Sequence, residues 1–89
     1  MIPANVDIVP TDYRLSWSDI RHIERLPLAA GIKKPLKSIQ ARNANEAWVT
    51  CGAPFLRNSE MTTFTGRRKN GRWFVDMSSI HNYQPIMVE

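Results

Sequence analysis

The sequence is poor in residues that cross-link a chain or hold a metal. Cys51 is the only cysteine among 89 residues, so no disulfide forms within the chain and a disulfide-stapled scaffold is excluded. His22 and His81 are the only histidines, and without a second cysteine they offer no metal-ligand spacing. No motif typical of a catalytic site is present. We therefore expect no metal and no cofactor, and we favour a non-enzymatic protein.

Long apolar runs, repeats and linkers are also lacking. No stretch approaches the ~18 apolar residues of a membrane-spanning helix, and the start lacks the basic and apolar regions of a signal peptide. We expect a cytoplasmic protein without a membrane partner. A chain of 89 residues has room for one core. We predict a single domain over 1–89, with an extended arm (1–14), a core (15–81) and a tail (82–89).

The composition is that of a folded, basic protein. With 43% hydrophobic and 22% charged residues, the chain is too apolar to be disordered. The formal net charge of +4 is compatible with an acidic partner such as nucleic acid or an acidic protein. A charge of that size also serves the ordinary solubility of a small domain.

The strongest local signal lies in residues 61–80, MTTFTGRRKNGRWFVDMSSI. Asn70-Gly71 predicts a two-residue type I′ turn, because that turn needs positive φ at both central positions. The resulting register pairs Lys69 with Arg72, Gly66 with Val75, and Phe64 with Met77.

Side chains alternate across a strand, so this hairpin has one apolar and one mixed face. The apolar face, which we expect to be buried, carries Phe64, Trp73, Val75 and Met77. The mixed face carries Thr63, Thr65, Arg67, Phe74, Asp76 and Ser78.

A helix is predicted to begin after Ser16. A serine N-cap with Asp19 three residues later, placing acidic charge in the first turn, is typical of a helix N-terminus. Pro27 limits this helix to about ten residues, since the residue before a proline resists the α region. The apolar positions that recur at helical spacing are Ile20, Ile23 and Leu26.

Two further strands are predicted over 37–42 and 47–52, joined by a turn rich in asparagine. Two registers are open. A five-residue connection turns Trp48 outward, whereas a four-residue connection pairs Ala41 with Trp48. We favour the first, because it buries the more continuous apolar set. That set is Ile39, Ala41, Ala47, Val49 and Cys51.

The remaining segments are less regular. Residues 1–13 predict an edge strand or an extended arm, and Pro10 argues against a central strand. Residues 53–60 read as a loop. A short helix followed by at least four antiparallel strands predicts an α+β fold, with the helix on one face of the sheet.

Three stretches resemble a group of small bacterial domains: LSWSDIRHIERL, KPLKSIQARNANEAWVTCG and TTFTGRRKNGRWFVDMSS. Together they span about residues 15–81, and their pattern is similar to cystatin-like and nuclear-transport-factor-2-like domains, closest to short immunity-type members. The resemblance implies a helix packed on a strongly bent antiparallel sheet of about four strands. It carries over no catalytic residue set.

The candidate site residues are cations and aromatics. Four of the twelve cations fall within six residues at the hairpin tip. The first interpretation is a solvated turn that discourages edge-to-edge aggregation; the second is a site for an acidic protein, and the third a site for nucleic acid. Trp48 and Phe74 are candidate partner contacts, because aromatics are enriched at interfaces. Trp17 and Trp73 are expected to pack in the fold. The tip cations are Arg67, Arg68, Lys69 and Arg72.

Cys51 could join a histidine and an acid as a nucleophile, but its apolar strand position favours an inert buried thiol.

The function we expect is therefore that of a small binding module, with the resemblance implying an immunity-type inhibitor that blocks a partner protein. A homodimer through the mixed sheet face is a further expectation. The alternatives are a ligand binder or minimal enzyme using the concave sheet face, and a basic nucleic-acid-associated protein.

Overall fold

The computed structural model describes residues 6–9, 11–52 and 61–82. The predicted loop over 53–60, and the tail beyond Asn82, lie outside these residues. The elements in chain order are β1 (Asp7–Val9), α1 (Trp17–Glu24), α2 (Leu26–Ala29), β2 (Leu36–Asn43), β3 (Glu46–Cys51), β4 (Thr62–Lys69) and β5 (Arg72–Asn82).

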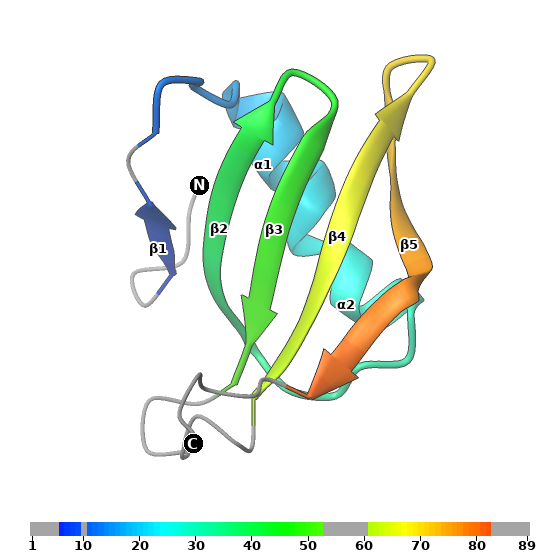
Figure 1. Ribbon diagram of the computed structural model, residues 1–89. Helices are drawn as coiled ribbons and strands as arrows, with labels where there is room; N and C mark the ends of the chain where they lie inside the picture. Colours follow the sequence, from blue (N-terminus) through cyan, green and yellow to red (C-terminus); the bar gives the residue numbers. More distant parts are fainter. Residues whose placement is uncertain (1–5, 10, 53–60, 83–89) are drawn as a thin grey trace.

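One sheet of five strands, in the order of the chain, organises the protein. β2 to β5 pair antiparallel with their neighbours, and β1 adds parallel to β2 as a short edge strand (Figure 1). The α+β class is thus confirmed, with a fifth strand supplied by the N-terminal arm.

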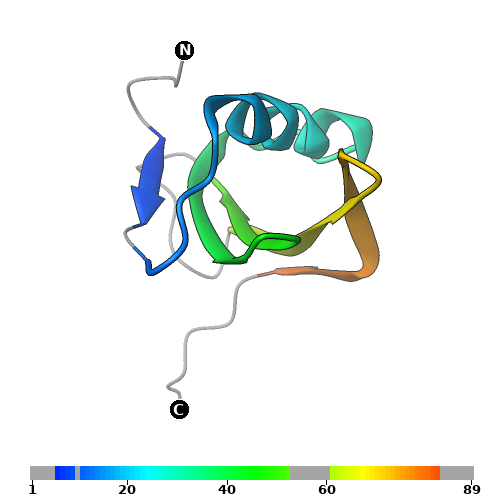
Figure 2. The ribbon, with the colours of Figure 1, turned by 90° about the horizontal axis from the view of Figure 1, so that it is seen from above.

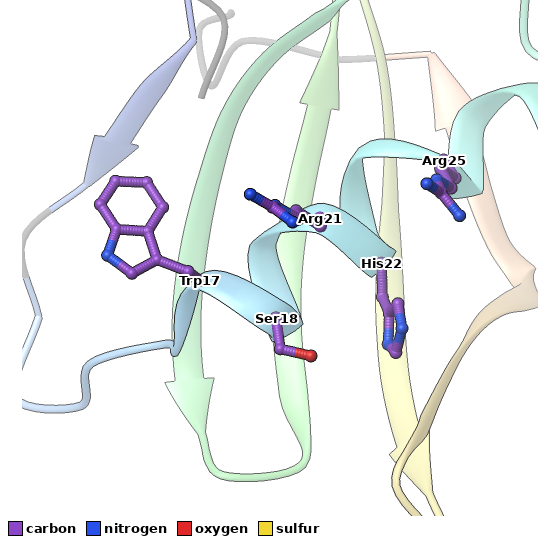
Figure 3. A pocket seen from close by; sticks show the side chains of 5 residues that line it. All are labelled: Trp17, Ser18, Arg21, His22 and Arg25. Atoms are coloured by element: carbon purple, nitrogen blue, oxygen red, sulfur yellow. The ribbon is translucent and has the colours of Figure 1, made fainter. Parts of the chain in front are cut away.

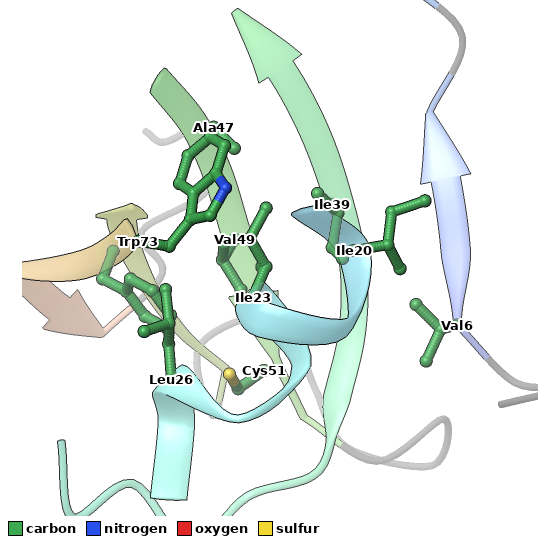
Figure 4. Packing of buried hydrophobic residues seen from close by; sticks show 10 residues of the cluster. Val6, Ile20, Ile23, Leu26, Ile39, Ala47, Val49, Cys51 and Trp73 are labelled. Atoms are coloured by element: carbon green, nitrogen blue, oxygen red, sulfur yellow. The ribbon is translucent and has the colours of Figure 1, made fainter. Parts of the chain in front are cut away.

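The sheet is strongly curved, and both helices lie on its concave side (Figure 2). Ile20, Ile23 and Leu26 are buried, as the helical spacing predicts. They pack with residues of the concave sheet face in one cluster (Figure 4). No helix of the described residues lies on the convex face of the sheet (Figure 2).

Ser16 is the N-cap of α1, as predicted. Its side-chain hydroxyl accepts a hydrogen bond of 3.1 Å from the Asp19 backbone N–H. The single helix predicted from the sequence is interrupted at Arg25, and Pro27 lies in the first turn of α2. Proline has no N–H to continue the helical ladder, but it fits the first turn of a new helix.

The favoured register of β2 and β3 is confirmed. Ile39 pairs with Val49 and Ala41 with Ala47, and all four side chains are buried together with Cys51. An irregularity between Ala41 and Asn43 accommodates the extra residue of the connection. Trp48 therefore points to the convex face, with 45% of its surface exposed.

The Asn70-Gly71 turn also forms as predicted, with φ of 53° and 78° at its central residues. Lys69 pairs with Arg72, and the register continues without a break to Thr65 and Asp76. On the apolar face Phe64 and Trp73 are buried, and the half-buried Val75 packs against the core.

Met77 is the error in the predicted register. It is 63% exposed and does not pair with Phe64, because the ladder shifts between Thr63 and Thr65. Thr65 pairs with Asp76 but Thr63 pairs with His81, so residues 77–80 stand opposite a single residue of β4. This bulge breaks the alternation and turns Met77 outward.

A serine holds the bulge in place. The Ser79 hydroxyl accepts a hydrogen bond of 2.7 Å from the Thr65 N–H and donates one of 2.6 Å to the Asp76 carbonyl. The hydroxyl thus bridges two backbone groups of facing strands. The Asp76 carboxylate accepts hydrogen bonds from the Ser78 N–H and hydroxyl, which shape the same turn.

Candidate binding surface at the β4–β5 hairpin

The predicted tip cations do not form one patch, because the strands alternate. Arg67, Lys69 and Arg72 share the convex side of the hairpin with Phe74, as the register of β4 and β5 requires. Arg68 lies on the helix side, opposite Trp73, and is half-buried. The cluster seen in the sequence is therefore divided between the two faces of the sheet.

Arg67 forms ion pairs within the protein. Its guanidinium donates hydrogen bonds of 3.0 Å to Glu46 on β3 and of 3.0 Å to Asp76 on β5. Hydrogen bonds from Ser78 and from Arg67 lower the pKa of the Asp76 carboxyl below its usual range. Two of the nearby carboxylates are thus already committed to one arginine.

Lys69 and Arg72 have no such partner in the part of the chain that the structure describes. They face each other across the ladder directly beside the turn, and both are exposed. Among the described residues neither makes an ion pair, since both salt bridges there belong to Arg67. These two cations are the part of the predicted tip that is left for a partner.

The two predicted aromatic contacts lie on the convex face but apart from each other. Trp48 is opposite Thr65, whereas Phe74 is opposite Arg67 on the far side of β4, with 50% of its surface exposed. The Arg42 guanidinium lies over the Trp48 ring, 5.7 Å from its centroid. Phe74 is therefore the aromatic that adjoins the free cations.

Two shallow depressions meet at Phe74. The one on the convex side is lined by Lys69, Met77 and the Arg67–Asp76 ion pair. The other lies between β5 and the helices and is lined by Arg25 and Trp73. Arg72 also lines it, although its register places it on the convex side, because β5 is the edge strand and its side chains border both faces. Both sides of β5 next to the turn are thus hollowed and carry at least one cation.

The exposed face of α1 was missed by the sequence reasoning. Figure 3 shows Trp17, Ser18, Arg21, His22 and Arg25 projecting from this helix around a further depression. Trp17 is 63% exposed, so the expectation that it packs on the sheet is wrong. The spacing of Trp17, Arg21 and Arg25, four residues apart, was the available signal.

The concave face of the sheet is filled. Ile39, Val49 and Phe64 point into it and are fully buried beneath α1 and α2. Within residues 6–9, 11–52 and 61–82, no three histidine, cysteine or acidic side chains gather as metal ligands. A ligand site on this face would have to displace the core.

Cys51 and the histidines lie in different places. Burial raises the pKa of the Cys51 thiol to about 11, although the charge of Lys34 acts in the opposite direction. His22 is exposed on α1, and the His81 Nε2 lies 3.1 Å from the Thr63 hydroxyl on the last strand. Among the described residues, neither histidine forms a hydrogen bond with Cys51, and a histidine needs such a bond to activate a cysteine nucleophile.

No helix in the described ranges is long and apolar enough to cross a membrane.

The candidate binding surface is the hairpin end formed by Lys69, Arg72 and Phe74, where predicted site residues lie beside cations that make no ion pair within the described residues. Comparison of the chain with protein-family profiles, with curated proteins and with solved structures finds no match to any of the three.

Proposed function

We propose that this protein is a small non-enzymatic module that binds an acidic protein partner through the end of the β4–β5 hairpin. The observation that carries the proposal is the pairing of Lys69 with Arg72 beside the exposed Phe74. Two cations directly opposite each other in a ladder repel. A carboxylate from a partner would remove that repulsion.

The surroundings favour an external anion over an internal one. Glu46 and Asp76 already accept hydrogen bonds from Arg67. Asp19, on the helix side, is buried and accepts a hydrogen bond from Trp73. Complementary charge on a partner would act mainly on the rate of association, because the field of exposed cations steers the encounter.

Phe74 gives this surface an apolar centre. Phenylalanine and arginine are both enriched in protein–protein interfaces relative to the rest of the surface. The resemblance to immunity-type domains suggests that the partner is a toxin or a nuclease, which the module would block in the cytoplasm by covering its surface. Pairing of two copies through the convex face stays a second prediction for the same side of the sheet.

The test is affinity capture from the native host with three baits, followed by quantitative mass spectrometry. One bait is the wild-type chain, and the second carries Lys69→Glu and Arg72→Glu. The third is a matched control with Arg14→Glu and Lys33→Glu, two exposed cations outside the hairpin. We expect an acidic protein that the wild type and the control retain and the hairpin variant loses.

Association kinetics with the captured protein sharpen the test. The hairpin variant should associate at least about tenfold more slowly at low salt, since steering contributes orders of magnitude to such rates. Its rate should also depend less on salt. Equal rates for hairpin variant and control would mean that the tip is only a solvated turn. We choose Lys69 over Arg68 because Arg68 lies near the buried Asp19.

The helix face favours a second candidate, binding to nucleic acid. Trp17 lies on the same exposed surface as Arg21 and Arg25, and an aromatic among cations suits a stacked base beside a phosphate. Affinity for generic single-stranded DNA that falls steeply with salt, and falls further in Trp17→Ala, would support it. Binding unchanged by Trp17→Ala would count against it.

A further inference from the structure

The long free edge of the sheet belongs to β5. Among the described strands β5 has one neighbour, β4, and ends the sheet order. The opposite edge carries β1, whose three residues pair with 38–40 of β2. Both ribbon views place the part of β5 next to the turn on the outside of the molecule (Figures 1 and 2).

The backbone of this edge is set to accept another strand. Lys69 and Arg72 pair directly across the two-residue turn, and the pair that flanks such a turn occupies a hydrogen-bonded position of the ladder. Hydrogen-bonded and non-bonded pairs alternate in an antiparallel ladder. Trp73 and Val75 therefore direct their N–H and C=O groups away from β4. The register is unbroken from Arg72 to Asp76, which leaves an edge of five residues with regular pairing before the bulge.

The two depressions described above flank this edge, one on each face of the sheet. Arg25 and Arg72 line the helix side, Lys69 and Met77 line the convex side, and Phe74 borders both. An added strand sends alternate side chains to opposite faces. Its side chains would therefore enter both depressions while its backbone pairs with Trp73 and Val75.

The charge of these depressions selects the occupant. In the described part of the chain, Asp76 is the one acidic residue that lines either of them. Asp76 already accepts hydrogen bonds from Arg67 and Ser78. A second copy docking through the same edge would set the same cations against these, and its Asp76 would be engaged in the same way, whereas an acidic segment would complement the edge.

We propose that the β5 edge takes up an extended acidic segment of a partner protein as a sixth strand of the sheet. The proposal rests on the function proposed above and specifies how the partner binds. Backbone pairing would supply the affinity, and the cations on both faces would select acidic side chains.

The test uses the full 89-residue chain and a defined probe. The probe is a fluorescein-labelled peptide of seven residues that alternates glutamate and valine, and its binding is followed by anisotropy. Two further peptides carry N-methyl groups on alternate amides, one on the glutamates and one on the valines. We expect the parent peptide to bind and at least one methylated peptide to bind about tenfold or more weakly, a loss comparable to one good contact.

Variants locate the site. Val75→Pro removes the outward N–H without removing a hydrogen bond to β4, and it should weaken the parent peptide about tenfold or more. The glutamates of this peptide all enter one face, so either Arg25→Glu or Lys69→Glu should weaken it, according to the face they enter, while the matched Lys33→Glu should not. If Val75→Pro fails to fold, as a melting curve would show, the methylated peptides still decide.

Three results would overturn the proposal. Both methylated peptides could bind as tightly as the parent, or folded Val75→Pro could bind the parent unchanged. Light scattering could also show a dimer that Val75→Pro dissociates, which would give the edge to a second copy. None of these results depends on the three-bait capture experiment. The proposal of strand addition and the proposal of an acidic partner can therefore be refuted independently.

Discussion

The Trp73 indole Nε1–H donates a hydrogen bond of 2.9 Å to Oδ1 of Asp19, which is 54 residues earlier in the chain. Both residues are buried. Asp19 lies in the first turn of α1, so this bond joins the helix start to the β4–β5 hairpin across the core. It is also the reason that an acidic side chain is tolerated among the buried residues.

Breaking this bond should destabilise the fold. Trp73→Phe leaves a buried carboxylate without its indole donor, and we expect a loss of about 1–3 kcal/mol in the free energy of unfolding. A double-mutant cycle with Asp19→Ala should give a coupling energy of about 0.5–3 kcal/mol, measured by urea denaturation. The control cycle pairs Asp19→Ala with Phe74→Leu, which should be additive. Additivity in the Trp73 cycle as well would contradict the assigned role.

The same contact predicts the response to acid. Burial raises the pKa of the Asp19 carboxyl, but hydrogen bonds from Trp73 and Ser16 and the charge of Arg68 lower it more, so its pKa is below the usual value. The unfolded state then binds more protons near pH 4. The stabilisation is therefore present above the ordinary aspartate pKa of about 3.9 and is lost as the pH falls through the lower folded value.

We expect the urea midpoint of the wild type to fall between pH 5 and pH 2.5, and to fall less in Trp73→Phe. The Asp76 carboxyl, whose pKa is also lowered, contributes in the same direction. If the urea midpoints of wild type and Trp73→Phe fall equally with pH, the pKa of Asp19 does not depend on the hydrogen bond from the Trp73 indole.

Phe64 and Met77 test the register of the hairpin. Phe64 is fully buried whereas Met77 is 63% exposed. Phe64→Ala should cost about 3–5 kcal/mol, and Met77→Ala should stay within about 0.5 kcal/mol of wild type. If Phe64→Ala does not fold, Phe64→Leu gives a smaller loss that can be measured. Similar losses of stability at both positions would support the direct pairing of Phe64 with Met77 that the turn alone predicts.

Local chemistry accounts for the parts of the fold that the sequence predicted. The Asn70-Gly71 turn follows from the φ angles of two adjacent residues, and the Ser16 cap from one side chain and a nearby N–H. The register of β2 and β3 followed from the alternation of apolar residues. Each of these depends on neighbours in the chain or on one strand pair.

Contacts between distant elements account for what was missed. Arg67 finds Glu46 only because β3 and β4 pair in one register. Met77 turns outward because the Ser79 hydroxyl bridges β4 and β5. Trp17 is exposed because the inner side of the first turn is occupied by Asp19, bonded to Trp73. For the candidate site, the density of positive charge in the sequence predicted its location. Which of the cations form ion pairs within the protein could be known only from the fold.

Ser79 provides a test of the bulge. Ser79→Ala removes a hydroxyl that satisfies one N–H and one carbonyl of facing strands, and we expect a loss of about 1–3 kcal/mol. Hydrogen exchange at the Thr65 amide should accelerate. The matched control is Ser78→Ala, whose hydroxyl bonds only the exposed side of Asp76 and which should cost under about 1 kcal/mol. Equal losses of stability in Ser79→Ala and Ser78→Ala would mean that the Ser79 hydroxyl does not hold the bulge in place.

Cys51 gives the last prediction. Burial raises the pKa of its thiol to about 11, and the thiolate is the reactive form. At pH 7.5 very little of the thiol is then ionised, and the side chain is also shielded by the core. An aromatic disulfide reagent should label the native protein at least about 100-fold more slowly than the urea-unfolded chain. Cys51→Ala should keep partner binding and lose about 1–2 kcal/mol of stability, as a small buried side chain would. Fast labelling of the folded protein would mean that the thiol is ionised near neutral pH, and it would reopen a nucleophilic role for Cys51.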